Sequence, residues 1–313
     1  MESNPAGIYP MLYAFYGPDG QLDREAMRRQ VTCCIESGAH GIAVLGLMTE
    51  VGQLSIQERL HIIEWAAADI DGRVPLSATI AGENALEQLQ FARQAEQLGA
   101  DWLVLQPPKH HQPSERELIR SFGEVMDGVS IPTGIQNFPE VLGIGLTPAG
   151  VGELHRQHAN FTVMKGEGPV YQIRQYMDAS HGGIHIFNGR GGIELPDNMH
   201  AGCAGIIPAP DCADVQVEMF NAFVRGNIDR VDELYALTLP YVIFVMQSVD
   251  FALTYGKRTT ARRIGLDDNV SVRNRQVEDD EFGLLRLDRH AQFLGPYGSW
   301  SEQAVPNMLL HRT

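Results

Sequence analysis

The sequence predicts a (β/α)8 TIM barrel with additional C-terminal helices. Short apolar runs alternate with longer segments of helical period about eight times in the first 226 residues, which is typical of βα units. Eight units favour closure of the parallel strands into a barrel. An open doubly wound sheet is the alternative, but Tyr16-Gly-Pro-Asp-Gly20, after the first strand, lacks the GxGxxG dinucleotide fingerprint.

Each expected strand is an apolar run followed by a segment with helix-start residues. The strands are expected at Gly7–Tyr13, Gly41–Leu45, Val74–Ile80, Trp102–Gln106, Ile131–Gln136, Phe161–Lys165, His185–Asn188 and Gly205–Pro208. Ser55 and Ser114 each precede a glutamate by three residues, which is the capping-box spacing. Thr147 stands directly before a proline, the favoured first residue of a helix. These signals place helix starts where the alternation requires them.

The strand pattern ends near Gly226. We therefore expect residues 1–226 to form the barrel and residues 227–313 to form a helical extension and tail. The helices expected in the extension are Ile228–Met246 and Val249–Gly265. No element is predicted from Asp267 onward, and the acidic run Glu278-Asp-Asp-Glu281 is interpreted as solvated surface.

Composition limits the classes of function. A formal net charge of −15 repels nucleic acid and anionic lipid, so an anionic ligand must be held by local donors. No segment is apolar for long enough to cross a bilayer, and the first residues lack the pattern of a secretory signal. The four cysteines, Cys33, Cys34, Cys203 and Cys212, show neither disulfide nor zinc spacing. We expect a cytoplasmic protein that binds neither nucleic acid nor membrane.

Lysine occurs only three times, and Lys165 ends the apolar run that begins at Phe161. An amine at the mouth of an apolar strand is partly desolvated, which favours the free base needed for a Schiff base. Glu167 projects to the same side if the strand continues, and it could then carry protons. The alternatives are a lysine whose head lies in water and an ordinary salt bridge. Lys109, in a proline-rich loop, and Lys257, in a C-terminal helix, are expected to be non-catalytic.

Catalytic residues of TIM barrels lie at the C-terminal ends of the strands. The polar residues expected there are Glu50, Gln106, Lys109, His110, Gln136, Asn137, Lys165, Glu167, Asn188 and Arg190. The turn Asn188-Gly-Arg-Gly-Gly192 would let the backbone approach a ligand, and Arg190 could pair with a distal hydroxyl or carboxylate. Alternatively, Arg190 binds Glu194 or Asp197 within the turn.

Four motifs in order carry a resemblance over most of residues 7–265. They are Gly46-Leu-Met-Thr-Glu50, Gly99-Ala-Asp-Trp102 with Gln106-Pro-Pro108, Gln136-Asn-Phe-Pro139, and Val163-Met-Lys165. The set resembles the class I Schiff-base lyases that include dihydrodipicolinate synthase, N-acetylneuraminate lyase and the 2-keto-3-deoxy sugar acid aldolases and dehydratases.

The resemblance implies a mechanism without an external cofactor. Lys165 would form a covalent imine with a small-molecule 2-keto acid, and the backbone around Leu47, Met48 and Thr49 would hold the substrate carboxylate. The resemblance also implies a homo-oligomer, usually a tetramer. The expected substrate-binding residues are Leu47, Met48, Thr49, Glu50, His110, Asn137, Asn188, Gly189 and Arg190, and no metal site is expected.

Departures from the family pattern indicate the type of reaction. The family usually has two threonines where this chain has Leu47 and Met48, and a tyrosine where it has Gln136; the tyrosine after Pro-Pro is replaced by Lys109 or His110. A glutamine amide cannot take the C4 hydroxyl proton, as aldol cleavage requires, but it can hydrogen-bond a substrate. Gln136-Asn-x-Pro together with Lys-x-Glu resembles the dehydratase branch.

The expected activity is therefore a hydro-lyase acting on a 2-keto-3-deoxy sugar acid. L-2-keto-3-deoxyarabonate, which would yield 2-oxoglutarate semialdehyde, is the expected substrate by resemblance. Lys165, Glu167 and Gln136 are the expected catalytic residues, and Glu167, or less favourably His110, would carry protons. Three alternatives stay open: a class I aldolase that uses the same imine, a non-catalytic sugar-acid binding barrel, and a metal-dependent enzyme. In a metal-dependent enzyme, the metal ligands would come from Glu50, His110, His111, Glu167 and His185.

Overall fold

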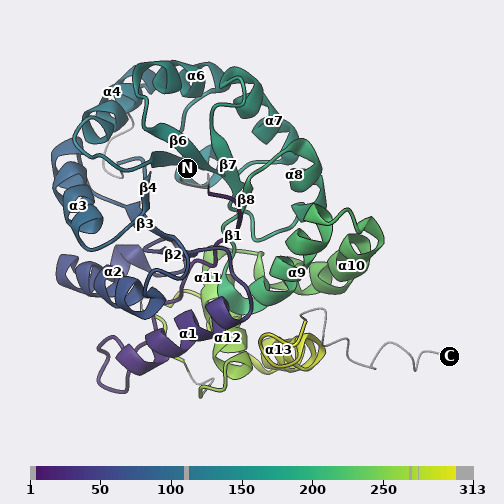
Figure 1. Cartoon of the computed structure of the whole chain (residues 1–313). Coiled ribbons are helices and arrows are strands. Elements are labelled where there is room, and N and C mark those ends of the chain that lie inside the picture. Colours follow the sequence, from purple (N-terminus) through teal and green to yellow (C-terminus); the bar gives the residue numbers. More distant parts are fainter. Residues whose placement is uncertain (1–4, 109–112, 268–269, 274, 301–313) are drawn as a thin grey trace.

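The computed structural model describes residues 5–108, 113–267, 270–273 and 275–300. Its strands form one eight-stranded parallel sheet in the order β1-β8-β7-β6-β5-β4-β3-β2. A parallel bridge between Met11 and Ala43 joins the chain after β1 to β2 and so closes the ring. The strands lie at the centre and the helices surround them (Figure 1). The predicted (β/α)8 barrel is confirmed.

The strands lie close to their expected positions. They are β1 (Gly7–Ile8), β2 (Ile42–Val44), β3 (Leu76–Ile80), β4 (Trp102–Leu105), β5 (Thr133–Asn137), β6 (Phe161–Gly166), β7 (His185–Asn188) and β8 (Gly205–Ile206). The first strand is shorter than expected because Pro10 has no N–H to donate. The backbone N–H groups of Tyr9 and Met11 nevertheless donate to the chain that follows β8, so the pairing continues to the top of the barrel.

Helices follow the strands in the expected alternation. They are α1 (Arg24–Glu36), α2 (Ile56–Ile70), α3 (Ala85–Gln97), α4 (Glu115–Met126), α5 (Pro139–Leu142), α6 (Pro148–Gln157), α7 (Val170–Ala179), α8 (Leu195–Ala201) and α9 (Ala213–Val224), with short turns η1 (Val51–Gln53) and η2 (Pro210–Cys212). The capping boxes at Ser55 and Ser114 are confirmed, and the Thr147 side chain accepts a hydrogen bond from Gly150 N–H.

The C-terminal part contains a helix that the sequence did not predict. The helical elements there are α10 (Ile228–Val245), α11 (Val249–Phe251), η3 (Ala252–Gly256), α12 (Lys257–Arg263) and α13 (Glu281–Leu294). Glu278, Asp280 and Glu281 of the acidic run are exposed, as expected, but the run also has a structural role. Asp280 caps α13 by accepting from Gly283 N–H, and Asp279 pairs with Arg258 and Arg275.

No single helix in the described chain has both the length and the apolar character needed to span a membrane. Among the described residues, α10 and Val249–Arg263 together have that length and apolar character, but the chain bends by 106° between them.

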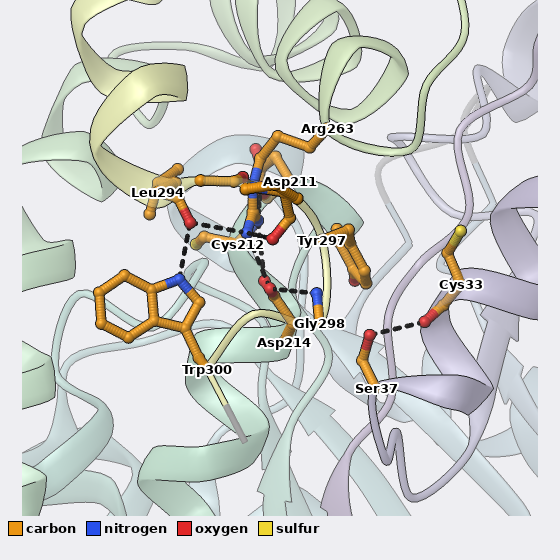
Figure 2. Close-up of polar contacts among 12 residues, drawn as sticks. Cys33, Ser37, Asp211, Cys212, Asp214, Arg263, Leu294, Tyr297, Gly298 and Trp300 are labelled. Carbon is orange, nitrogen blue, oxygen red and sulfur yellow. Dashed lines mark hydrogen bonds and ion pairs between the residues drawn. The ribbon is translucent and has the colours of Figure 1, made fainter. Parts of the chain in front are cut away.

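A buried arginine fixes the C-terminal segment to the barrel. The Arg263 guanidinium donates two hydrogen bonds to the Asp214 carboxylate, at 2.8 and 2.7 Å, and also donates to Leu294 O at 3.1 Å. The indole N–H of Trp300 donates to the same carbonyl, and Gly298 N–H donates to Asp214 (Figure 2). This ion pair therefore joins α9, α12 and the chain that follows α13.

An aromatic cluster fills the barrel below its C-terminal end. The rings of Tyr9, Trp102 and Phe187 lie with their centroids 5.2 to 5.5 Å apart, and all three side chains are buried. Lys165 is in register with Gln136 on one side and with Phe187 on the other. The polar side chains of Lys165 and Gln136 therefore lie directly above a packed apolar interior.

Candidate functional site

Lys165 and Glu167 form a buried ion pair at the end of β6. The Lys165 Nζ lies 2.9 Å from Glu167 Oε1, and both residues are about 95% buried, at 5% and 4% exposure. Because β6 continues through Gly166, alternation places the two side chains on the same face, as the sequence predicted. Proton exchange between the amine and the carboxylate needs no rearrangement at this distance.

Two glutamines form a hydrogen-bonded chain that orients the Glu167 carboxylate. Gln136 Nε2 donates to Glu167 Oε1 at 2.5 Å, and Gln106 Nε2 donates to Gln136 Oε1 at 2.7 Å. The Gln106 carbonyl in turn accepts from the buried Gln88 amide. Within the described chain, Glu167 Oε2 has no hydrogen-bond partner, so this oxygen is available to a ligand. Gln136 contacts the ion pair but does not line the cavity.

Gly189 allows this pair to occupy its position. A Cβ at residue 189 would lie 2.5 Å from Glu167 Cγ and 2.8 Å from Lys165 Cε. Both atoms belong to the buried side chains of the ion pair, so an added methyl group would displace that pair. The expected glycine turn after β7 therefore packs its backbone directly against the ion pair.

We predict that Gly189→Ala displaces the ion pair while the protein stays folded. Overpacking costs about 1–3 kcal/mol, and because the ion pair must regain its position before the amine can react, the same amount is added to the barrier, roughly a 5- to 150-fold loss in the rate of covalent trapping by a 2-keto acid. Borohydride trapping followed by mass spectrometry measures this rate. Gly17→Ala is a matched control, since its Cβ would meet Asp19 Oδ1 at 3.1 Å and Gln21 O at 4.0 Å, away from the ion pair. Equal trapping rates in the two variants would contradict the prediction.

The loop after β2 is held in a strained conformation. Leu45 and Glu50 have positive φ angles, 65° and 57°, which are unfavourable for residues with a side chain. Between them, the backbone N–H groups of Leu47 and Met48 have no hydrogen-bond partner among the described residues. The Thr49 hydroxyl donates to Leu12 O at 2.6 Å and so is occupied within the fold. Two adjacent free N–H donors are an arrangement that suits a carboxylate.

Glu50 holds the loop after β2 in place through two hydrogen bonds. Its carboxylate accepts from Lys257 Nζ at 2.8 Å and from the Arg273 backbone N–H at 2.7 Å. Lys257 is completely buried, and burial lowers its pKa, although the Glu50 charge opposes this effect. Its Nζ also lies 4.7 Å from the centre of the Tyr16 ring. Both Glu50 oxygens are thus engaged within the fold, and Glu50 does not line the cavity, so it positions the loop.

A cavity of about 270 Å³ lies above the ion pair. The predicted site residues on its wall are Leu47, Met48, Lys165, Glu167, Gly189 and Arg190. The wall also contains residues that sequence reasoning missed: Met11, Phe138, Glu140, Gly191, Ile193, Ile207, Pro208, Ala209, Asp211, Cys212, Val242, Val245, Met246, Gln247, Ser248, Val249 and Ala252. Asp211 and Cys212 follow β8, where strand-end reasoning could have found them. The wall residues from α10 to η3 carry no recognisable signal.

Asn137 and Asn188 do not line the cavity, and both, like Arg190 on its wall, make contacts within the protein. Asn137 exchanges two hydrogen bonds with the Leu146 backbone, each 2.9 Å long, and Asn188 accepts from Arg190 N–H. The Arg190 guanidinium pairs with Glu194 at 2.8 Å, as one of the two interpretations expected. Lys109, His110 and His111 lie outside the described residues, and within those residues no cluster of three or more possible metal ligands occurs.

Known proteins resemble this chain over most of its length. The model of the Dihydrodipicolinate synthetase family matches residues 4–280. The 4-hydroxy-tetrahydrodipicolinate synthase of Pelobacter propionicus is 29% identical over 221 residues, which are 69% of this chain and 75% of that protein. YagE of Escherichia coli K12, provisionally named a 2-dehydro-3-deoxy-D-gluconate aldolase, is 29% identical over 258 residues, covering 78% and 85% of the two chains.

Solved structures agree with the barrel. The crystal structure of YagE in complex with pyruvate has a TM-score of 0.84 at 26% identity, covering 92% of this chain and 98% of that one. The dihydrodipicolinate synthase of Thermotoga maritima has a TM-score of 0.85 at 18% identity, covering 92% and 98%, and supports the fold alone. The resemblance drawn from the motifs is confirmed. This chain belongs to the dihydrodipicolinate synthetase family.

Proposed function

We propose that this chain is a Schiff-base-dependent hydro-lyase that dehydrates a 2-keto-3-deoxy sugar acid. L-2-keto-3-deoxyarabonate, converted to 2-oxoglutarate semialdehyde, is the substrate that its motifs favour. The observation that carries the proposal is the buried contact of 2.9 Å between Lys165 and Glu167, with Gln136 where aldol chemistry would need a phenol. The pyruvate bound to the related YagE supports a 2-keto acid as ligand.

The cavity offers an anchor for the acid end of such a substrate. The free N–H groups of Leu47 and Met48 would bind the carboxylate and so hold the adjacent C2 ketone for Lys165. At the other end of the molecule, Arg190, Gln247 and Ser248 offer polar groups to the sugar hydroxyls.

Glu167 can carry protons in successive steps. It first accepts a proton from the Lys165 ammonium, and the resulting amine attacks C2. It then returns this proton to the carbinolamine hydroxyl, which leaves as water, so that Glu167 is a carboxylate again. The protonated imine draws electrons from C3 and acidifies its hydrogens. The Glu167 oxygen that Gln136 leaves free then accepts one C3 proton, and an enamine forms.

The cavity wall favours dehydration over aldol cleavage. Among the described wall residues there is no tyrosine and no threonine, and the Thr49 hydroxyl is bound to Leu12 O. Cleavage of the C3–C4 bond requires a base that takes the C4 hydroxyl proton, whereas dehydration requires an acid that protonates that hydroxyl. We further propose that the protein works without an external cofactor, as a homotetramer in the cytoplasm.

The test is product analysis by NMR with L-2-keto-3-deoxyarabonate. Formation of 2-oxoglutarate semialdehyde is the expected result. Formation of pyruvate and glycolaldehyde would identify an aldolase, the activity that the provisional name of YagE favours. Reversible binding with neither product and no covalent adduct would identify a sugar-acid binding barrel.

A further inference from the structure

Asp211 is a second buried carboxyl group on the wall of the cavity, where the carboxyl group of Glu140 is exposed. Asp211 follows β8 in the short turn η2 and is 4% exposed. Sequence reasoning assigned it no role, and the steps derived above for Lys165 and Glu167 do not use it. Within the described chain it forms no ion pair, which is unusual for a buried carboxyl group.

The surroundings of Asp211 are phenolic and apolar. The Tyr13 hydroxyl lies 3.5 Å from Asp211 Oδ2, and the buried Tyr241 hydroxyl has no hydrogen-bond partner in the described part of the chain. Cys212 N–H donates to Asp211 Oδ1 at 2.9 Å. Burial raises the pKa of Asp211 to about 6, because these partners do not compensate fully for its removal from water.

The π-helical turn η3 makes room for this carboxyl group. A Cβ at Gly256 would lie 2.7 Å from Asp211 Oδ2 and 2.5 Å from the Tyr13 hydroxyl. Ala252, at the start of the same turn, lies on the cavity wall and accepts a hydrogen bond from Tyr13 at 3.3 Å. π-Helical turns are rare and occur frequently at functional sites.

Arg263 fixes the position of Asp211 without pairing with its carboxylate. The guanidinium donates to the backbone O of Asp211 at 2.8 Å, while the carboxylate that it binds belongs to Asp214 (Figure 2). The backbone is thus rigid, and the nearest arginine charge is already balanced. This arrangement favours the protonated form of Asp211 more than the surroundings of an exposed aspartate would.

We propose that Asp211 is the general acid that protonates the C4 hydroxyl of the substrate as it leaves. The inference rests on the proposed dehydratase function. When the enamine collapses, its electrons form the C3–C4 double bond and the nitrogen regains its positive charge. The C4–O bond breaks with its electron pair on oxygen, and that oxygen takes the Asp211 proton and leaves as water. Asp211 remains as a carboxylate and is reprotonated from solvent.

Two carboxyl groups in different surroundings can then divide the work. Glu167 lies beside a lysine and suits the role of base, whereas Asp211 has no cationic partner and suits the role of acid. With this division, Glu167 takes the C3 proton when the enamine forms, and Asp211 supplies the proton at C4 when the enamine collapses.

The experiment compares wild type with Asp211→Asn in three assays. These are borohydride trapping with pyruvate, deuterium exchange of the pyruvate methyl group in D2O, and dehydration of L-2-keto-3-deoxyarabonate. Trapping and exchange report the imine and the enamine, and neither needs an acid at C4. We expect both to persist in the variant while dehydration falls by about 100- to 10,000-fold. Asp288→Asn, at an exposed ion pair on α13, is the control and should retain all three activities.

Two further readouts separate an acid from a merely structural residue. A 4-fluoro analogue expels fluoride, which needs less help from a proton, so Asp211→Asn should lose far less activity on it. In wild type, the dehydration step should also slow as the pH rises through the pKa of Asp211, about 6, and the variant should lack this dependence. The groups that face this carboxyl and set its titration are Tyr13, Cys212, Asp214, Tyr241 and Arg263.

The outcomes distinguish this inference from the proposed function. No adduct on wild type would overturn the Schiff-base function and the role of Asp211 with it. An adduct on wild type, with dehydration retained in Asp211→Asn, would overturn the role of Asp211 alone. Loss of trapping and exchange together in the variant would likewise overturn it, since the residue would then support the fold of the site.

Discussion

Lys165→Ala is expected to abolish covalent trapping by pyruvate and to lower the turnover of any 2-keto acid substrate by roughly four orders of magnitude or more. The physical reason is that the cavity offers a single amine: among the described residues, Lys257 is the only other lysine, and it is completely buried against Glu50. Intact mass after borohydride reduction, followed by peptide mapping, measures the adduct and its position.

The matched control removes a cation that lies away from the cavity. Arg120→Ala, at an exposed position on α4, should form the adduct at the wild-type rate. Circular dichroism should show that Lys165→Ala remains folded. An adduct that persists in the alanine variant, or that maps to another residue in wild type, would contradict the assignment of Lys165.

Lys257→Met is expected to cost about 3–5 kcal/mol in the free energy of unfolding. The substitution leaves the Glu50 carboxylate buried at 4% exposure with only the Arg273 backbone N–H to stabilise it. Because Glu50 holds the loop that carries Leu47 and Met48, the affinity for a 2-keto acid should fall as well. Urea unfolding and ligand titration measure the two effects.

The double variant Lys257→Met/Glu50→Gln separates charge from packing. Removing both members of a buried ion pair costs less than removing one, so the second substitution should restore part of the lost stability. Ligand affinity should recover less than stability, because a glutamine amide does not hold the strained loop as a carboxylate does. If the effects of the two single substitutions simply add, the pair is not coupled and the interpretation fails.

The sequence predicted the parts of the site that depend on the alternation of side chains along a strand or on a local turn. Lys165 and Glu167 meet because one strand continues for two residues, and Gly189 was expected in a turn that approaches the ligand. The roles of Glu50 and Asn137 were not predictable in this way. Their partners, Lys257 and Leu146, lie in other elements, and no spacing within a motif records such a contact.

The missed features share a similar cause. The helix α13 is covered on one side only and follows an acidic run, so its local pattern resembles surface loop. Asp211 carries no distinctive motif, since its character comes from Tyr13, Tyr241 and Gly256, which approach it from three distant segments. Strand order places residues near a site, but the chemistry of a buried group is set by tertiary packing.

The contact between Glu50 and Lys257 joins residues that are 207 positions apart in the chain. During synthesis, the loop after β2 emerges long before the lysine that secures it. The barrel strands can pair while this loop still lacks its support, because all eight strands precede residue 257 in the chain. The anion-binding end of the cavity is therefore expected to mature last, so that a partly made chain can be compact yet unable to retain a keto acid.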